Sequence, residues 1–359
     1  MIARPILFVI DDINYNGGAH MATARLIAHL TVAGHRVTVF SSTDVQSEEI
    51  GLRFNGADIR SAGSPITRFD QMGIMEALNC KSFSLLRKAQ RVIIGVLKRL
   101  GLYYPMVYDN EKRLLGRLLS ECSEVVVVGE NSIFADFVAH NCFVRKVIMI
   151  HTDYDALARF EGYTIFRRYH DLRVCEKMDA IGIIGEGNCN RFKKRHKKLA
   201  SKCFPFLNYV QEFPRRIHVS NSIKQCQTFH ALTICRFDAN KDVLRLLRIA
   251  ERLKRSGLRF RWDIYGDGPL FVDATAAVSR MGLEDCVRLP GYVHNTAISF
   301  CDYNVMVMAS HYEGCCPLVV FEALSSCLPV LATDVGSMSN WIDGIEDRKS
   351  GSAGMPRPI

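Results

Sequence analysis

The sequence lacks long apolar runs, and none approaches the ~20 consecutive apolar residues that a membrane-spanning helix requires. It also lacks a C-x-x-C pair and the spacings of zinc ligands, because its 13 cysteines are scattered along the chain. The apolar N-terminal stretch reaches Asp11 and Asp12 too early for a signal peptide. These absences predict a cytoplasmic protein whose thiols are reduced.

Motifs of nucleic-acid-binding proteins are absent as well. The sequence has no zinc knuckle, no RNA-recognition motif and no repeat of arginines with aromatics, although its formal net charge is +9. A basic surface can also meet anionic lipid or a phosphorylated substrate. We therefore expect no nucleic-acid partner, and the charge leaves the other two partners open.

The length of 359 residues allows two ordinary domains, and 48% apolar with 23% charged residues is typical of a globular protein. Residues 209–227 show no periodicity and contain Pro214, which predicts an interdomain linker. The expected organisation is an N-terminal domain, this linker, a C-terminal domain and a disordered tail, at 1–208, 209–227, 228–347 and 348–359.

The most informative stretch covers residues 303–336. Its apolar and polar segments predict a strand, a loop, a helix and a second strand, at 304–308, 310–318, 318–326 and 329–333. Pro317 suits the first helical position, where a missing N–H costs nothing. Ligands of parallel sheets bind beyond the carboxyl ends of the strands, so Glu313 and the start of this helix are expected at a ligand site. The free N–H groups of a helix N-terminus suit a phosphate.

This stretch contains Ser310-x-x-Glu313-Gly with Pro317, followed by Glu322-Ala and V-x-A-T-D-V-G. Together these motifs resemble those of the retaining glycosyltransferases of the GT-B fold, family four. That family has an E-x7-E signature, whereas eight residues separate the two glutamates here; we attribute the extra residue to the Cys315-Cys316 pair. The resemblance implies an α/β GT-B fold of two Rossmann-like domains whose parallel sheets face a cleft. Family members continue with further helices beyond the last matching motif, so the C-terminal helices are expected to be truncated.

In the C-terminal domain, Arg236 and Lys241 follow the predicted strand 228–235 and match the family's pair that grips the donor diphosphate. Without a metal, fixed cations must stabilise the leaving diphosphate; ordinary loop charges are the alternative interpretation. By resemblance, Glu322 holds the ribose, and Glu313 with nearby loop amides holds sugar hydroxyls as a catalytic residue. The remaining donor-binding candidates of this domain are Gly266, Val293, Cys316, Pro317 and Leu318.

In the N-terminal domain, a strand at 5–10 leads to Gly17 and Gly18 and then to a helix at 20–32. A glycine pair alone indicates a plain turn, but this order matches the family's opening, in which the backbone approaches the donor. His151 follows a strand at 146–150; it either faces the donor sugar as a catalytic residue, as in the family, or is satisfied locally. Asp153-x-Asp155 mimics the metal-binding motif of another glycosyltransferase fold, and we reject a metal because the resembled family needs none.

Two basic segments allow a membrane contact. Residues 74–104 predict a helix with basic and apolar sides, which is either a covering helix or a membrane-surface helix. The run 191–198 is either a solvated helix face or a contact with lipid or acceptor phosphate. A peripheral contact with an anionic membrane, at its cytoplasmic face, is therefore one expectation.

The resemblance implies a retaining hexosyltransferase with no cofactor and a UDP- or GDP-linked sugar as co-substrate. A glycan or lipid-linked molecule would be the acceptor, in bacterial polysaccharide or lipopolysaccharide assembly by family analogy. No side chain stands out as a nucleophile, so the family's front-face mechanism is expected, with the protein supplying orientation and electrostatics. The alternative is a catalytically impaired GT-B protein that binds a nucleotide or glycan.

Overall fold

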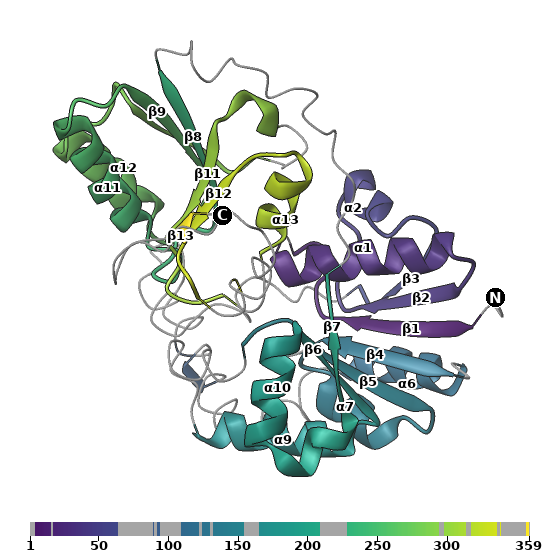
Figure 1. Ribbon diagram of the computed structural model, residues 1–359. Coiled ribbons are helices and arrows are strands. Elements are labelled where there is room, and N and C mark those ends of the chain that lie inside the picture. The colour runs from purple at the N-terminus through teal and green to yellow at the C-terminus, as the bar shows by residue number, and fades with distance from the viewer. Residues whose placement is uncertain are drawn as a thin grey trace. The chain divides into compact units, whose positions relative to one another are not determined.

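The computed structural model describes residues 4–15, 17–63, 89, 92–93, 109–121, 124–129, 132–153, 165–208, 228–293, 298–313, 317–335, 338 and 357–358 (Figure 1). The chain divides into two compact units, residues 1–209 and 210–359. The expected linker at 209–227 lies outside the described residues, as does the expected tail apart from 357–358.

The N-terminal unit is built on a seven-stranded parallel sheet in the order β3-β2-β1-β4-β5-β6-β7. Its strands are β1 (Pro5–Ile10), β2 (Arg36–Ser41), β3 (Asp58–Ser61), β4 (Val125–Gly129), β5 (Arg145–Ile150), β6 (Ala180–Ile184) and β7 (Cys203–Phe206). The chain moves outward from β1 to β3 and then outward in the other direction from β4 to β7. The strand order therefore switches between the adjacent strands β1 and β4, which is where ligands of such sheets bind.

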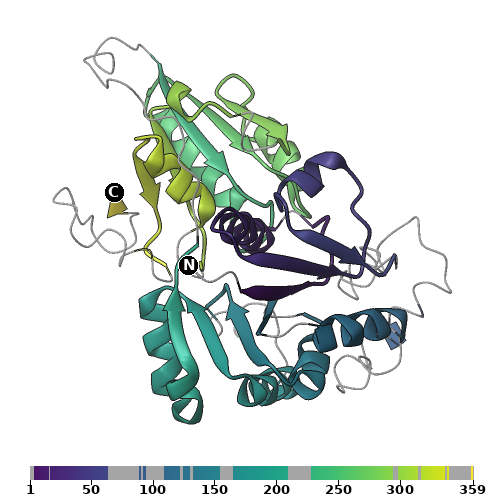
Figure 2. The ribbon, with the colours of Figure 1, turned by 90° about the vertical axis from the view of Figure 1, so that its right-hand side faces the viewer.

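Helices cover both faces of this sheet. They are α1 (Gly18–Val32), α2 (Glu48–Leu52), α6 (Asp109–Glu121), α7 (Ala135–Asn141), α9 (Ile165–Lys177), α10 (Glu186–Arg195) and the 3-10 helix η1 (Lys197–Lys202). Successive strand residues point to opposite faces, so Leu7 packs in the same core as helices α6 to α10, whereas Phe8 packs with α1. Figure 2 shows the dark purple α1 on one side of this sheet and the teal helices on the other.

The C-terminal unit has a six-stranded sheet in the order β10-β9-β8-β11-β12-β13. Its strands are β8 (Phe229–Ile234), β9 (Phe260–Tyr265), β10 (Val287–Gly291), β11 (Val305–Met308), β12 (Val330–Ala332) and β13 (Arg357–Pro358). All neighbours pair in parallel except β12 and β13, which are antiparallel. The strand order switches between β8 and β11, because the chain runs from β8 toward β10 and from β11 toward β12.

Right-handed crossovers in opposite directions place helices on opposite faces of this second sheet. The helices are α11 (Val243–Arg255), α12 (Phe271–Arg280), the 3-10 helix η4 (Phe300–Asp302) and α13 (Leu318–Ser325). Figure 1 shows α11 and α12 on one side of the sheet and α13 on the other. Under α11 and α12 the core centres on Trp262, which is 2% exposed.

The predicted helix 318–326 is confirmed as α13, which begins at Leu318, but the predicted role of Pro317 is wrong. Pro317 is not the first helical residue but the residue before it, because its ψ of 141° is extended. Its carbonyl oxygen accepts the first bond of the helix, from the N–H of Val320 at 2.9 Å. Across the part of the chain that the structure describes, no helix is both long enough and apolar enough to cross a membrane.

Candidate functional site

The loops that follow β8 and β11 lie at the switch point of the C-terminal sheet. These strands are adjacent and parallel, so their carboxyl ends lie side by side. The ammonium of Lys241, in the first loop, bonds the Oε1 atom of Glu313, in the second. The Lys241 side chain is 19% exposed and that of Glu313 is 9% exposed, so water screens this pair weakly. Two residues predicted for the donor site are therefore in contact across 72 positions of sequence.

Asn240 ties the two loops together through its backbone and its side chain. Its carbonyl oxygen accepts the N–H of His311 at 2.8 Å, and its Oδ1 accepts the N–H of Tyr312 at 2.9 Å. From the residue that follows β12, the Thr333 hydroxyl donates to the carbonyl of Ser310 at 2.7 Å. The backbone just before Glu313 is thus held from both sides.

Asp242 adds a charged link between the same loops. It precedes α11 with a φ of +45°, in the left-handed region, and its carboxylate accepts the N–H of Arg245 at 3.2 Å as a helix cap. The Nε2 atom of His311 lies 3.0 Å from Oδ2 of Asp242. Residues 240 to 242 therefore each contact the segment 311–313 by a different group.

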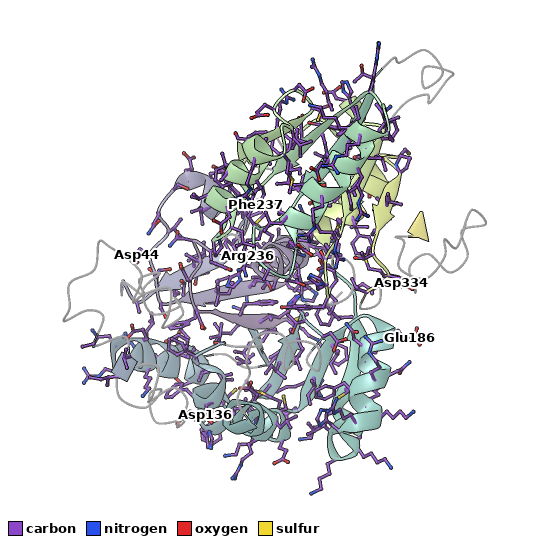
Figure 3. All side chains as sticks on the ribbon, turned by 90° about the vertical axis from the view of Figure 1, so that its left-hand side faces the viewer. Asp44, Asp136, Glu186, Arg236, Phe237 and Asp334 are labelled. Atoms are coloured by element: carbon purple, nitrogen blue, oxygen red, sulfur yellow. The ribbon has the colours of Figure 1, made fainter. Side chains whose placement is uncertain are left out.

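Arg236 is fixed by Asp238 on the same loop. The Nε of Arg236 donates to Oδ2 of Asp238 at 2.7 Å, and Oδ1 of Asp238 accepts the N–H of Lys241 at 2.9 Å. The Arg236 side chain remains 59% exposed, so its guanidinium can reach a ligand from solvent. Figure 3 labels Arg236 beside the buried Phe237. One carboxylate thus sets the positions of both candidate phosphate-binding residues.

The helix α13 supplies the other donor-site candidates. Pro317 and Leu318 form its entrance, which has no side-chain cap among the described residues, and this leaves its first N–H groups for an anion. Glu322 lies one turn further along the helix and is fully buried. Cys316 and the extra residue of the loop lie outside the described residues.

Gly266 and Val293 belong to the ends of β9 and β10, next to the Arg236 loop. The N–H of Cys235 bonds the carbonyl of Tyr265 at 3.0 Å, and the N–H of Gly266 bonds the carbonyl of Gly291 at 2.9 Å. A Cβ atom at position 266 would be 1.8 Å from the carbonyl oxygen of Cys235. Gly266 is therefore required for packing the loops, and Val293 follows as a partly exposed residue.

In the N-terminal unit, Gly17 and Gly18 form the entrance to α1. Gly17 is the residue before the helix, and a Cβ atom at Gly18 would meet nothing within 4 Å, so space exists for a ligand to approach that position. His20, in the first turn, packs edge-on against Tyr15 with 4.8 Å between the ring centres. Burial lowers the pKa of His20, with Asp12 opposing the shift.

His151 follows β5 and packs against Phe206, with 5.1 Å between the ring centres. Burial lowers its pKa to about 4; Asn208 opposes this shift and His20 adds to it. The imidazole is therefore neutral at pH 7, and its buried Nδ1 atom has no hydrogen-bond partner in the described structure. His20 acts on the charge of His151, and such an effect requires proximity. His151 therefore lies near the first turn of α1, which contains His20.

Of the acidic pair near His151, the structure describes only Asp153. Asp153 accepts a bond from Arg191 of α10 at 3.0 Å, and Asp155 lies outside the described residues. Within the described ranges, no three His, Cys, Asp or Glu side chains come together as metal ligands would.

Comparison with known proteins identifies the C-terminal unit. Residues 228–351 match the family described as glycosyl transferases group 1. Over these residues, the C-terminal unit is similar to the group 1 glycosyltransferases. The match begins at β8 and includes Arg236, Lys241, Glu313 and Glu322, which are the residues arranged around the switch point.

Curated relatives support the same family over parts of their length. EpsF of Bacillus subtilis (strain 168), described as a glycosyltransferase, is 34% identical over 101 residues, or 28% of this chain and 26% of EpsF. The poly(ribitol-phosphate) alpha-N-acetylglucosaminyltransferase of Staphylococcus aureus (strain COL) is 29% identical over 240 residues, or 66% of this chain and 46% of that enzyme. The chain thus matches about a quarter and about half of the lengths of these two relatives.

Solved structures show that the likeness of fold extends over both units. S. aureus TarM, crystallised with fondaparinux, α-GlcNAc-glycerol and UDP, superposes with a TM-score of 0.66 at 15% identity. The superposition covers 94% of this chain and 87% of TarM. The chain has the GT-B fold, as the resemblance implied.

The group 1 motifs identified Lys241 and Glu313 but missed the residues that hold them. Asp238, Asn240 and His311 were not singled out, because their partners lie on other loops and no local pattern marks them. Asp242 could have been found, since an aspartate directly before an apolar-periodic helix is a capping signal.

Proposed function

We propose that this protein is a retaining glycosyltransferase. It moves a hexose-type sugar from a UDP- or GDP-linked donor to a glycan or lipid-linked acceptor, without a metal. The observation that carries the proposal is the contact of Lys241 with Glu313 at the switch point of a group 1 glycosyltransferase domain. The TarM structure, which contains UDP, favours a uridine donor.

The chemistry of sugar transfer explains why this site needs cations. As the glycosidic bond breaks, the nucleoside diphosphate gains negative charge, and Arg236 and Lys241 stabilise it together with the first N–H groups of α13. Glu322 holds the ribose hydroxyls, and Glu313 holds hydroxyls of the transferred sugar. The departing phosphate oxygen takes the acceptor proton in this front-face mechanism, so the protein needs no side-chain nucleophile.

The Cys235 thiol, directly before Arg236, does not supply a nucleophile. Burial raises the pKa of the Cys235 thiol to about 12, with Lys241 opposing the shift. This thiol therefore stays protonated at neutral pH, and a thiol reacts as its thiolate. Covalent catalysis through Cys235 is thus disfavoured.

The N-terminal unit is proposed to bind the acceptor. Gly17 and Gly18 offer backbone close to the donor, and His151 contacts the transferred sugar as a neutral imidazole. Neutral imidazole both donates and accepts hydrogen bonds, which suits a sugar hydroxyl.

The test is product formation from a panel of nucleotide sugars. UDP-glucose, UDP-N-acetylglucosamine and GDP-mannose would each be incubated with the protein, and release of UDP or GDP would be measured with and without EDTA. We expect turnover with one donor and no loss in EDTA; NMR of the product anomeric proton would then show retention. The variant Glu322→Gln should stay folded and lose donor affinity. Nucleotide binding without turnover of any donor would identify the impaired binding protein instead.

We also propose a cytoplasmic protein that contacts the membrane at its periphery. The end of α10 and η1 carry exposed basic side chains, Lys194, Arg195, Lys197 and Lys198, and Phe204 on the edge strand β7 is 40% exposed. Figure 3 shows long side chains extending from α10, whose first residue, Glu186, is labelled. The other basic segment, 74–104, lies outside the described residues except for 89 and 92–93.

Vesicle sedimentation tests this contact directly. The protein should sediment with phosphatidylglycerol vesicles and stay in solution with phosphatidylcholine vesicles. Replacing Lys194, Lys197 and Lys198 by glutamate should abolish sedimentation. Equal sedimentation of that variant would remove the α10 and η1 surface from the proposal.

A further inference from the structure

The ion pair between Lys241 and Glu313 has a consequence for donor binding, which rests on the proposed function. The ammonium expected to hold a diphosphate is already bonded to a carboxylate of the same protein. Both groups are largely buried, so water replaces neither partner easily. A diphosphate can reach Lys241 fully only if Glu313 gives up this bond.

We propose that Glu313 acts as an internal counter-anion that competes with the donor diphosphate for Lys241. In the free protein the pair stabilises a closed resting state of the site. When a donor binds, its phosphate oxygens take the ammonium, and the released Glu313 carboxylate turns to the sugar hydroxyls. Donor binding thereby prepares the residue that positions the sugar.

The surrounding contacts allow this exchange without moving the loops. The backbone before Glu313 is bonded to Asn240, and the backbone of Lys241 is bonded to Asp238, so both main chains are fixed independently of the ion pair. His311 is joined separately to Asp242. Only the two long side chains need to change partners, which is a rotamer change and not a loop opening.

The proposal predicts an effect opposite in sign to that of a simple binding residue. Removing a residue that only contacts the ligand weakens binding. Glu313→Gln instead removes a competing negative charge next to the diphosphate, so UDP or GDP should bind more tightly, by about 5- to 20-fold. A tenfold gain in affinity corresponds to ~1.4 kcal/mol of binding free energy. The same variant should lose turnover, because glutamine does not replace the carboxylate at the sugar.

A double-mutant cycle with Lys241→Met tests whether the gain acts through the ammonium. Calorimetry would give the UDP and GDP affinities of the wild type, of each single variant and of the double variant. We expect tighter binding in Glu313→Gln, weaker binding in Lys241→Met, and no gain from Glu313→Gln when Lys241 is already methionine. Melting curves confirm that each variant is folded.

Two controls separate this mechanism from a general change of charge. Asp285→Asn removes one negative charge from the same unit, at an exposed residue that pairs with Lys254, and should leave nucleotide affinity unchanged. Uridine or guanosine, which have no phosphate, should bind Glu313→Gln and wild type equally. Unchanged or weaker diphosphate binding in a folded Glu313→Gln variant would overturn the proposal, as would an equal gain in the Lys241→Met background. Failure of the wild type to bind either nucleotide would instead contradict the proposed function.

Discussion

Gly266 lies so close to Cys235 that a Cβ atom at position 266 would be 1.8 Å from the Cys235 carbonyl oxygen. Gly266 also has a φ of +139°, which side chains rarely adopt. The atom in the way is backbone and cannot rotate aside, so Gly266→Ala must shift the Arg236 loop. We expect a loss of more than about 3 kcal/mol in the free energy of unfolding of the C-terminal unit.

The chain offers a matched control for this substitution. Gly257 also has a positive φ, +80°, but a Cβ atom there meets nothing within 4 Å. Gly257→Ala should therefore cost only the backbone strain, about 1–2 kcal/mol. Both tryptophans, Trp262 and Trp341, belong to the C-terminal unit, so their fluorescence during urea unfolding follows that unit. Equal losses for the two variants would show that the contact with Cys235 does not matter.

The ion pair of the candidate site also makes a prediction about stability. Lys241→Met leaves the buried Glu313 carboxylate without its cation, and breaking a buried pair from one side typically costs about 3–5 kcal/mol. Adding Glu313→Gln removes the unpaired charge, so the double variant should recover most of this loss. Urea unfolding followed by tryptophan fluorescence measures both values. A double variant no more stable than Lys241→Met would mean that the pair is screened by water after all.

Much of the fold could be predicted from the sequence because local patterns determine it. The apolar run at 5–10 predicted β1 with its observed bounds, and the run at 146–150 predicted β5 except for its first residue. The helix after Pro317 was also predicted, although proline's fixed φ allows both the cap and the first helical position, and only the observed ψ separates them.

The candidate site was predictable as a set of motifs but not as a set of contacts. Glu313 and Lys241 were each identified by neighbouring residues, whereas their bond depends on which strands lie side by side. Periodicity reports whether a strand is buried and not which strand it pairs with. For the same reason, the role of Asn240 in holding residues 311 and 312 could not be predicted.

The lowered pKa of His151 predicts a dependence of stability on pH. The folded protein keeps this imidazole neutral down to a pH of about 4, while the unfolded chain takes up the proton near pH 6.5. As pH falls from 6.5 toward 4, the unfolded state therefore binds more protons, and stability decreases. Between pH 7 and pH 5 the contribution of His151 is a loss of roughly 2 kcal/mol.

Substitution of His151 should remove this part of the pH dependence. We expect His151→Gln to lose about 2 kcal/mol less than wild type between pH 7 and pH 5, whatever its stability at pH 7. Urea unfolding followed by circular dichroism at both pH values gives the difference. An unchanged slope in His151→Gln would show that another group titrates.

Arg236 tests the diphosphate grip separately from Lys241. Its guanidinium is exposed and oriented by Asp238, so Arg236→Ala should leave the fold intact. Losing one charge-assisted contact with a phosphate typically costs ~1.5–3 kcal/mol, which corresponds to roughly 10- to 100-fold weaker UDP or GDP binding. Arg255→Ala, on α11 and paired with Glu251, removes the same charge elsewhere in the unit and should bind normally. Calorimetry that gives the same affinity for both variants would exclude Arg236 from the site.

The extra residue between Glu313 and Glu322 provides a last test, which concerns turnover. The structure fixes the chain on both sides of it, because the Asn240 bonds hold residues 311 and 312, and α13 begins at Leu318. Deleting Cys315 restores the seven-residue spacing of the family but must pull on these fixed ends. Misplacing a positioning group by about 1 Å can lower a rate on the order of 100-fold, so we expect the deletion to reduce turnover far more than nucleotide affinity. Increased turnover would show instead that the loop carries an unadapted insertion. Unchanged turnover and affinity together would mean that this loop does not position Glu313 for the reaction.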